Sequence, residues 1–105
     1  MCEKIIEEGS PYDENYIIRK QSRLIAKLTS PKSKIQLTVF SNQPAVQFSS
    51  GQYLKFLSKS KVLNAHQGMC LETQCFPKSP NNKKFPSSLL KPKETYLHNM
   101  KFKIS

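Results

Sequence analysis

Glu72 is the residue whose type and position in this chain most suggest chemistry. It lies in the run HQGMCLETQ, and only one other acid follows residue 14. Because alternate side chains of a strand share a face, Glu72 is expected to share one with Cys70 and Gln74. A carboxylate beside a thiol and an amide suits a polar cleft, where it could act as a general base. The residue pattern alone still favours the alternative, a structural role on a strand that faces solvent.

The histidines and cysteines offer two other kinds of chemistry. His66, Cys70 and Cys75 are spaced as His-x3-Cys-x4-Cys, and His98 would have to supply a fourth ligand. This spacing lacks the paired C-x2-C of common zinc sites, so we expect no metal. A Cys–His nucleophile pair needs contact between the side chains, which nothing in the sequence indicates. We expect buried, inert thiols instead. Three scattered glycines form no phosphate loop, and no cofactor is predicted.

The charge of the chain is large and unevenly placed. The 105 residues, enough for one domain, carry a net charge of +10. Residues 1–16 hold five acids and one lysine, whereas residues 17–105 hold sixteen bases and two acids. Such a balance raises nonspecific affinity for nucleic acids. Because the lysines are scattered singly or in pairs, we expect solvated strand faces and loops, and no nucleic-acid partner. Lysine and aromatic residues interleave in QYLKFL (52–57), where apolar packing is favoured over base stacking.

Cysteine usage and the lack of long apolar runs bear on location. The three cysteines are an odd number, which gives no closed disulfide framework. The beginning MCEKIIEEGS is charged and has no apolar run long enough for a signal peptide. No segment approaches the roughly 20 apolar residues of a membrane span. These observations predict a reduced, cytoplasmic protein without membrane contact.

Short strands separated by turn residues are predicted for most of the chain. Residues 23–29 and 34–40 flank Ser-Pro-Lys-Ser and predict a hairpin, although the first run also fits a helical stripe. Further strands are predicted at residues 45–49 and 69–76, and a long irregular connection at 77–94. The last predicted strand places Tyr96, His98, Met100, Phe102 and Ile104 on one face, with Lys101 and Lys103 on the other. The fold class is therefore mostly β, a sandwich or part of one.

Four stretches together resemble motifs of the galactose mutarotase (aldose 1-epimerase) family, in the order and approximate spacing of its C-terminal part. YDENY (12–16) resembles YDHNF, and PAVQFSSG (44–51) resembles PGVQFYTG. HQGMCLETQ (66–74) resembles HSGFCLETQ, and FPSSLLKPKETY (85–96) resembles FPPVLLRPGETY. The resemblance covers nearly the whole chain, and implies one incomplete domain over residues 1–105. Its fold would be a partial β-sandwich, the C-terminal portion of a galactose-mutarotase-like supersandwich.

The resemblance also implies a function. Members of this family interconvert the α and β anomers of aldoses such as galactose and glucose. The glutamate of the CLETQ motif, Glu72 here, is the family's base. The motif aspartate that holds sugar hydroxyls corresponds to Asp13, and the motif glutamine, a further sugar contact, corresponds to Gln47. A small-molecule aldose is thus the expected partner.

Departures from the family's pattern limit this expectation. The resemblance places the general-acid histidine and a second active-site histidine in a portion that this chain does not span, and neither His66 nor His98 matches them. We therefore expect little or no mutarotase activity from the chain alone. A noncatalytic carbohydrate-binding module and a basic interaction protein remain alternatives. Uncovered sheet edges could allow self-association. Lys93 replaces a common glycine, which would strain a turn that needs positive φ.

Overall fold

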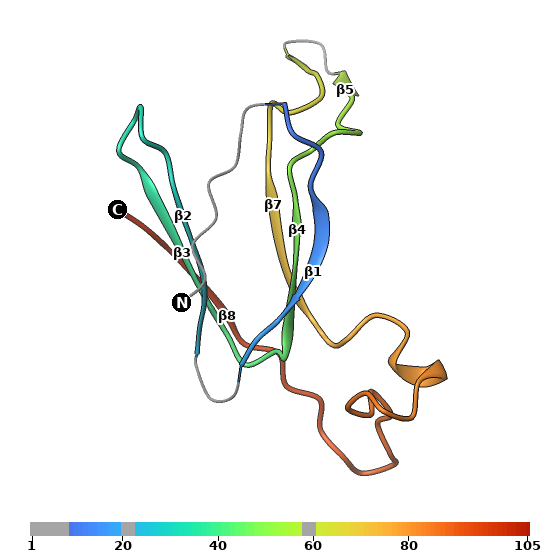
Figure 1. Ribbon diagram of the computed structural model, residues 1–105. Coiled ribbons are helices and arrows are strands. Elements are labelled where there is room, and N and C mark those ends of the chain that lie inside the picture. The colour runs from blue at the N-terminus through green and yellow to red at the C-terminus, as the bar shows by residue number, and fades with distance from the viewer. Residues whose placement is uncertain (1–8, 20–22, 58–60) are drawn as a thin grey trace. The chain divides into compact units, whose positions relative to one another are not determined.

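The computed structural model describes residues 9–19, 23–57 and 61–105 of the chain, and this part is mostly β (Figure 1). It contains eight strands, one short 3₁₀ turn and no α-helix. The chain forms two compact units, one from Met1–Glu14 with Gln47–Glu72 and the other from Asn15–Val46 with Thr73–Ser105. The described residues confirm the predicted partial β-sandwich class.

One three-stranded sheet has the order β1-β4-β7, with β1 at Asp13–Ile17, β4 at Ala45–Ser49 and β7 at Cys70–Gln74 (Figure 1). The predicted strand at residues 45–49 is confirmed, and the one at 69–76 is shorter than expected. The strand β1 was not predicted, because YDENY lacks an apolar alternation. Pairing with β4 rather than local preference sets its conformation.

The second sheet has the order β2-β3-β8, with β2 at Leu24–Thr29, β3 at Gln36–Ser41 and β8 at Met100–Ile104. β2 and β3 form the predicted antiparallel hairpin, so the first run is a strand and not a helix. Its turn is closed by hydrogen bonds between Ser30 and both Lys34 and Ile35. Lys34 has a φ of 62°, and β3 begins only after it.

The predicted last strand was too long at its N-terminal end. Residues 96–99 are not part of β8, which begins at Met100 opposite Ser41, the last residue of β3. Beyond Ser41 the chain turns away, so earlier residues have no strand to pair with. The Asn42 side chain instead donates to the Leu97 carbonyl at 2.9 Å and accepts from the Asn99 amide at 2.9 Å.

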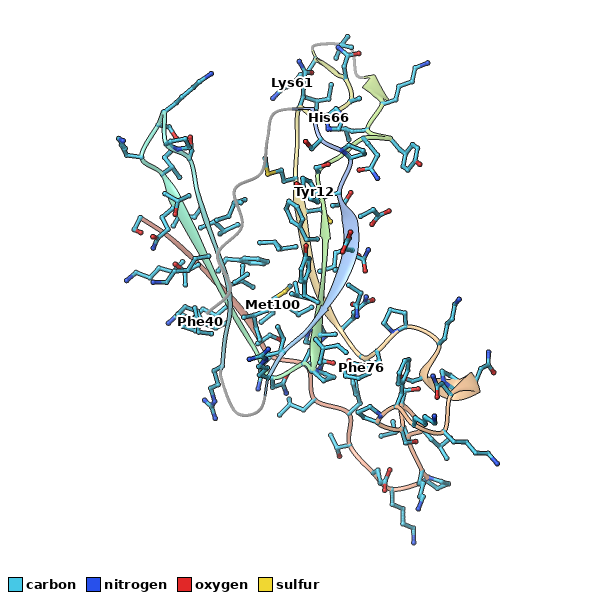
Figure 2. The ribbon with its side chains drawn as sticks, viewed as in Figure 1. Tyr12, Phe40, Lys61, His66, Phe76 and Met100 are labelled. Atoms are coloured by element: carbon cyan, nitrogen blue, oxygen red, sulfur yellow. The ribbon has the colours of Figure 1, made fainter. Side chains whose placement is uncertain are left out.

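Two smaller features complete the described chain. β5 (Phe56–Leu57) and β6 (Val62–Leu63) form a short antiparallel pair. The connection 77–94 is irregular, as predicted, apart from the 3₁₀ turn η1 at Ser79–Asn81. Where this connection begins, the Phe76 ring, labelled in Figure 2, packs edge-on against the Phe85 ring at a centroid distance of 5.3 Å.

The core is small. Among the described apolar residues, Val39, Ala45 and Val46 are buried in the second unit and Phe48 in the first. The second unit also buries polar groups: the Ser41 hydroxyl donates to the Thr73 hydroxyl at 3.1 Å. No described helix is long and apolar enough to span a bilayer.

Candidate functional site

Asp13 and Gln47, two of the three predicted site residues, are in direct contact. Asp13 is exposed at the start of β1, and Gln47 is half-buried in the middle of β4, the neighbouring strand. The Gln47 side-chain amide donates a hydrogen bond to Asp13 Oδ1 at 2.7 Å. Each side chain therefore fixes the orientation of the other, although 34 positions separate them in the sequence.

Glu72, the third predicted residue, lies in β7, on the other side of β4. Its side chain is exposed, and the Cys70 thiol donates a hydrogen bond to Glu72 Oε1 at 2.6 Å. The two side chains are therefore on one face of the strand, as the alternation predicted. The hydrogen bond to Glu72 raises the pKa of Cys70 to about 11, with smaller contributions from burial and from the charges of Glu72 and Asp13.

The charge of Asp13 acts on the same thiol, so Asp13 lies within electrostatic range of Cys70. The parts of three adjacent strands that belong to the first unit thus present two carboxylates, an amide and a thiol. Carboxylate and amide oxygens accept hydrogen bonds from hydroxyl groups, and an exposed carboxylate can take up a proton. This set of groups suits a neutral ligand that carries several hydroxyls.

Ser50, which sequence reasoning missed, ties the ends of β1 and β4 together. Its hydroxyl donates to the Ser10 carbonyl at 2.8 Å and accepts from the Tyr12 amide at 2.9 Å, and its own amide donates to the Tyr12 carbonyl at 2.9 Å. The Tyr12 ring also packs against Phe48 at a centroid distance of 6.2 Å. The only signal in the sequence was a serine directly before Gly51, and its burial is known only from the structure. These contacts position the strand that carries Asp13.

His66 has a structural place in the loop before β7. Its amide donates to the Gly51 carbonyl at 2.9 Å, and its ring Nδ1 lies 3.3 Å from the Ser50 carbonyl oxygen. Figure 2 labels His66 and Tyr12 at this end of the first unit. In the described part of the chain, no three of the histidine, cysteine and acidic side chains form a group that could hold a metal ion.

The cysteines are not the buried thiols that we expected. Cys70 and Cys75 are both half-buried. Cys70 lies in β7, an edge strand of the described sheet, and Cys75 follows directly after it. Cys70 donates to Glu72, and Cys75 donates to Gln43 Oε1 at 3.6 Å. Cys2 lies outside the described residues.

The second unit holds the remaining predicted candidates. Gln74 donates to Asn15 Oδ1 at 3.0 Å. His98 Nε2 lies 2.8 Å from the hydroxyl of the buried Thr73. An open cavity of about 520 Å³ lies in the irregular connection and contains no predicted site residue. It is lined by Ser79, Pro80, Asn82, Lys83, Phe85, Ser87, Ser88 and Leu89.

Comparison with known proteins agrees with the motifs. The sequence model of the family described as aldose 1-epimerase matches residues 3–103. Galactose mutarotase of Mus musculus is 38% identical over 99 residues, which are 90% of this chain and 29% of the mouse protein. Galactose mutarotase of Homo sapiens is 37% identical over 99 residues, again 90% of this chain and 29% of the human protein. Aldose 1-epimerase of Escherichia coli (strain K12) is 30% identical over 92 residues, 81% of this chain and 27% of the bacterial protein.

The predicted resemblance is therefore confirmed over nearly the whole chain, while the chain spans less than a third of the length of these relatives. The chain belongs to the aldose 1-epimerase family.

Proposed function

We propose that this chain carries the general-base part of an aldose mutarotase site, for hexoses such as galactose and glucose. The supporting observation is the 2.7 Å hydrogen bond between Gln47 and Asp13, in the same unit as the Glu72 carboxylate that accepts from Cys70. The names of the relatives, galactose mutarotase and aldose 1-epimerase, support the substrate class.

In the proposed reaction, Glu72 takes the proton of the anomeric hydroxyl while an acid protonates the ring oxygen. The bond between the ring oxygen and C1 breaks, giving the open-chain aldehyde. Rotation about C1–C2 then lets the ring close on the other face of the carbonyl. A positioned base contributes typically about 10²–10⁴-fold to such a step.

Asp13 and Gln47 would hold the sugar rather than take part in proton transfer. Asp13 has a second carboxylate oxygen, and Gln47 has its amide oxygen, and both can accept from hydroxyl groups. Their mutual hydrogen bond fixes the two side chains before the sugar arrives, which lowers the entropic cost of orienting it. Neutral hydroxyls are a suitable partner for this acidic set of side chains.

The proposed site is incomplete, because the resemblance places the acid histidine in a portion that the chain does not span. His66 contacts the Ser50 backbone instead. We therefore propose that the chain alone binds an aldose without accelerating its mutarotation appreciably. The proposal includes a cytoplasmic location and needs no cofactor or metal.

Two measurements on the chain test this proposal. Galactose and glucose are titrated into labelled protein, and the amide signals of Asp13, Gln47 and Glu72 are followed by NMR. Polarimetry on the pure α anomers gives the rate. We expect saturable signal changes and a rate equal to the spontaneous one. The absence of any sugar response contradicts the proposed site, and a faster rate that is lost in Glu72→Gln shows that the chain is an enzyme by itself.

A further inference from the structure

The outer edge of β8 offers unpaired backbone groups. β8 pairs with β3 on one side and is the edge strand of its sheet in the described part of the chain. At one end of this pair, Gln36 and Ser105 exchange two backbone hydrogen bonds, of 2.7 and 3.0 Å. Antiparallel ladders alternate between hydrogen-bonded and non-hydrogen-bonded pairs. The N–H and C=O groups of Met100, Phe102 and Ile104 therefore point away from β3.

The same three residues carry an apolar face that the chain leaves open. Ser41 and Met100, which lie opposite each other, both contact the Thr73 hydroxyl, so their face is the inner face of the sheet. Phe102 lies opposite the fully buried Val39 on this same face. Nevertheless Phe102 is 49% exposed and Ile104 74% exposed, and Met100 (labelled in Figure 2) is 48% exposed. The inner face is thus covered at Val39 and Ser41 of β3 but only partly covered at β8, where Met100 contacts the Thr73 hydroxyl and Ile104 is mostly exposed.

The opposite face of β8 is basic. Lys101 and Lys103 are exposed and lie opposite Phe40 and Thr38 of β3. If a second copy paired antiparallel about Phe102, its Lys103 would lie against Lys101. Like charges directly opposite each other destabilise a sheet, and edge lysines are a common protection against such pairing. The charges therefore disfavour a second copy and favour an acidic strand.

We propose that the edge of β8 binds an extended polypeptide segment as an added antiparallel strand. Five of its residues alternate apolar, acidic, apolar, acidic, apolar. The apolar residues lie opposite Met100, Phe102 and Ile104, where backbone hydrogen bonds form and the inner face is extended. The acidic residues lie opposite Lys101 and Lys103. This strand addition uses the second unit alone and is independent of the sugar site.

A pair of matched peptides tests the proposal. The probe is acetyl-Thr-Ile-Glu-Val-Glu-Ile-Thr-amide, and its control has lysine in place of both glutamates. NMR titration of the full chain follows the amide signals of Met100, Phe102 and Ile104. We expect the acidic peptide to shift these three signals and to bind about tenfold more tightly than the basic one. Added salt should reduce this difference, because the charges are exposed.

Backbone-modified peptides distinguish strand addition from nonspecific attraction. N-methylation at the three apolar positions removes the N–H groups that face β8 and should abolish binding, whereas N-methylation at the two acidic positions should be tolerated. The double variant Lys101→Glu/Lys103→Glu should reverse the preference between the peptides. Its β3 amide signals report whether the sheet is retained.

Three results would overturn the proposal: equal binding of both peptides, unchanged signals of β8, or equal effects of N-methylation at both sets of positions. Sedimentation of the chain alone provides a further check. If the chain dimerises in a way that depends on Lys101 and Lys103, the edge belongs to a second copy and not to an acidic segment.

Discussion

The side-chain amide of Gln47 donates a 2.7 Å hydrogen bond to the Asp13 carboxylate, joining the neighbouring strands β4 and β1 on the exposed side of the first unit. Both side chains can also bond to a ligand, so the contact orients two acceptors at once. The proposed sugar site depends on this contact.

Replacing Asp13 by alanine should weaken galactose binding by about tenfold or more, because a hydrogen bond to a charged group is lost. The free energy of unfolding should fall by less than about 1 kcal/mol, since the side chain is exposed. NMR titration and urea unfolding measure the two effects. Glu14→Ala is the matched control, because Glu14 is the next residue on the same strand and points to the other face. Equal losses in both variants would show that charge alone matters.

The Cys70 thiol should react slowly with iodoacetamide at pH 8. Its hydrogen bond to Glu72 favours the protonated form and raises the thiol pKa to about 11 from an ordinary value of 9.0. The thiolate is the nucleophile, so the rate should rise with pH until about 11. Because the folded-state pKa is the higher one, the stabilising effect of this contact is complete below pH 9 and disappears as the pH rises through 11. Mass spectrometry of the alkylated chain assigns the rate to Cys70.

Glu72→Gln removes the charge beside this thiol and should lower its pKa, so the alkylation rate at pH 8 should increase. Glu14→Gln removes a charge from the other face of β1 and serves as the comparison. If both variants leave the rate of Cys70 unchanged, the contact between the thiol and the carboxylate does not form in solution.

The local pattern of the sequence predicted much of the second sheet. The alternation in residues 34–40 and the turn before it indicated the β2–β3 hairpin, because side chains that alternate in polarity fit only a half-buried strand. The predicted beginning of β8 was wrong. The strand begins where β3 provides a partner, opposite Ser41, and the polarity of Tyr96 and His98 does not indicate this point. The alternation of polarity along a strand predicts which side chains share a face, but it does not predict which strand pairs with it.

The residues of the candidate site were predicted from the family motifs and not from local patterns of polarity. Asp13 lies in β1, a strand without apolar alternation, and its contact with Gln47 spans 34 positions. No local rule connects two such residues. The contact between Cys70 and Glu72 could be predicted, because residues two positions apart on a strand point to the same face.

Lys93→Gly should stabilise the chain. The Glu94 amide donates to the Lys91 carbonyl at 3.1 Å, closing a four-residue turn with Pro92 and Lys93 at its centre. Lys93 has a φ of 70°, so this is a type II turn, whose third position favours glycine. Removing the strain should outweigh the extra freedom of the unfolded chain and add about 0.5–1 kcal/mol. Urea unfolding measures this, with Lys91→Gly as a control that should not stabilise.

Gly51→Ala should destabilise the chain more strongly than Gly9→Ala, and the comparison separates two physical effects. Both glycines have positive φ, 70° and 81°, so alanine is strained at either position by about 1 kcal/mol. At Gly9 an added β-carbon meets nothing within 4 Å, whereas at Gly51 it would overlap the carbonyl oxygen of Gly68, which is backbone and cannot simply rotate away. We expect a loss of about 1 kcal/mol for Gly9→Ala and about 3 kcal/mol for Gly51→Ala in urea unfolding. Because Gly68 lies in the loop that leads into β7, the amide signals of Cys70 and Glu72 should shift in the second variant only. Equal losses of stability in the two variants would mean that the loop at Gly51 does not approach the loop at Gly68 in solution.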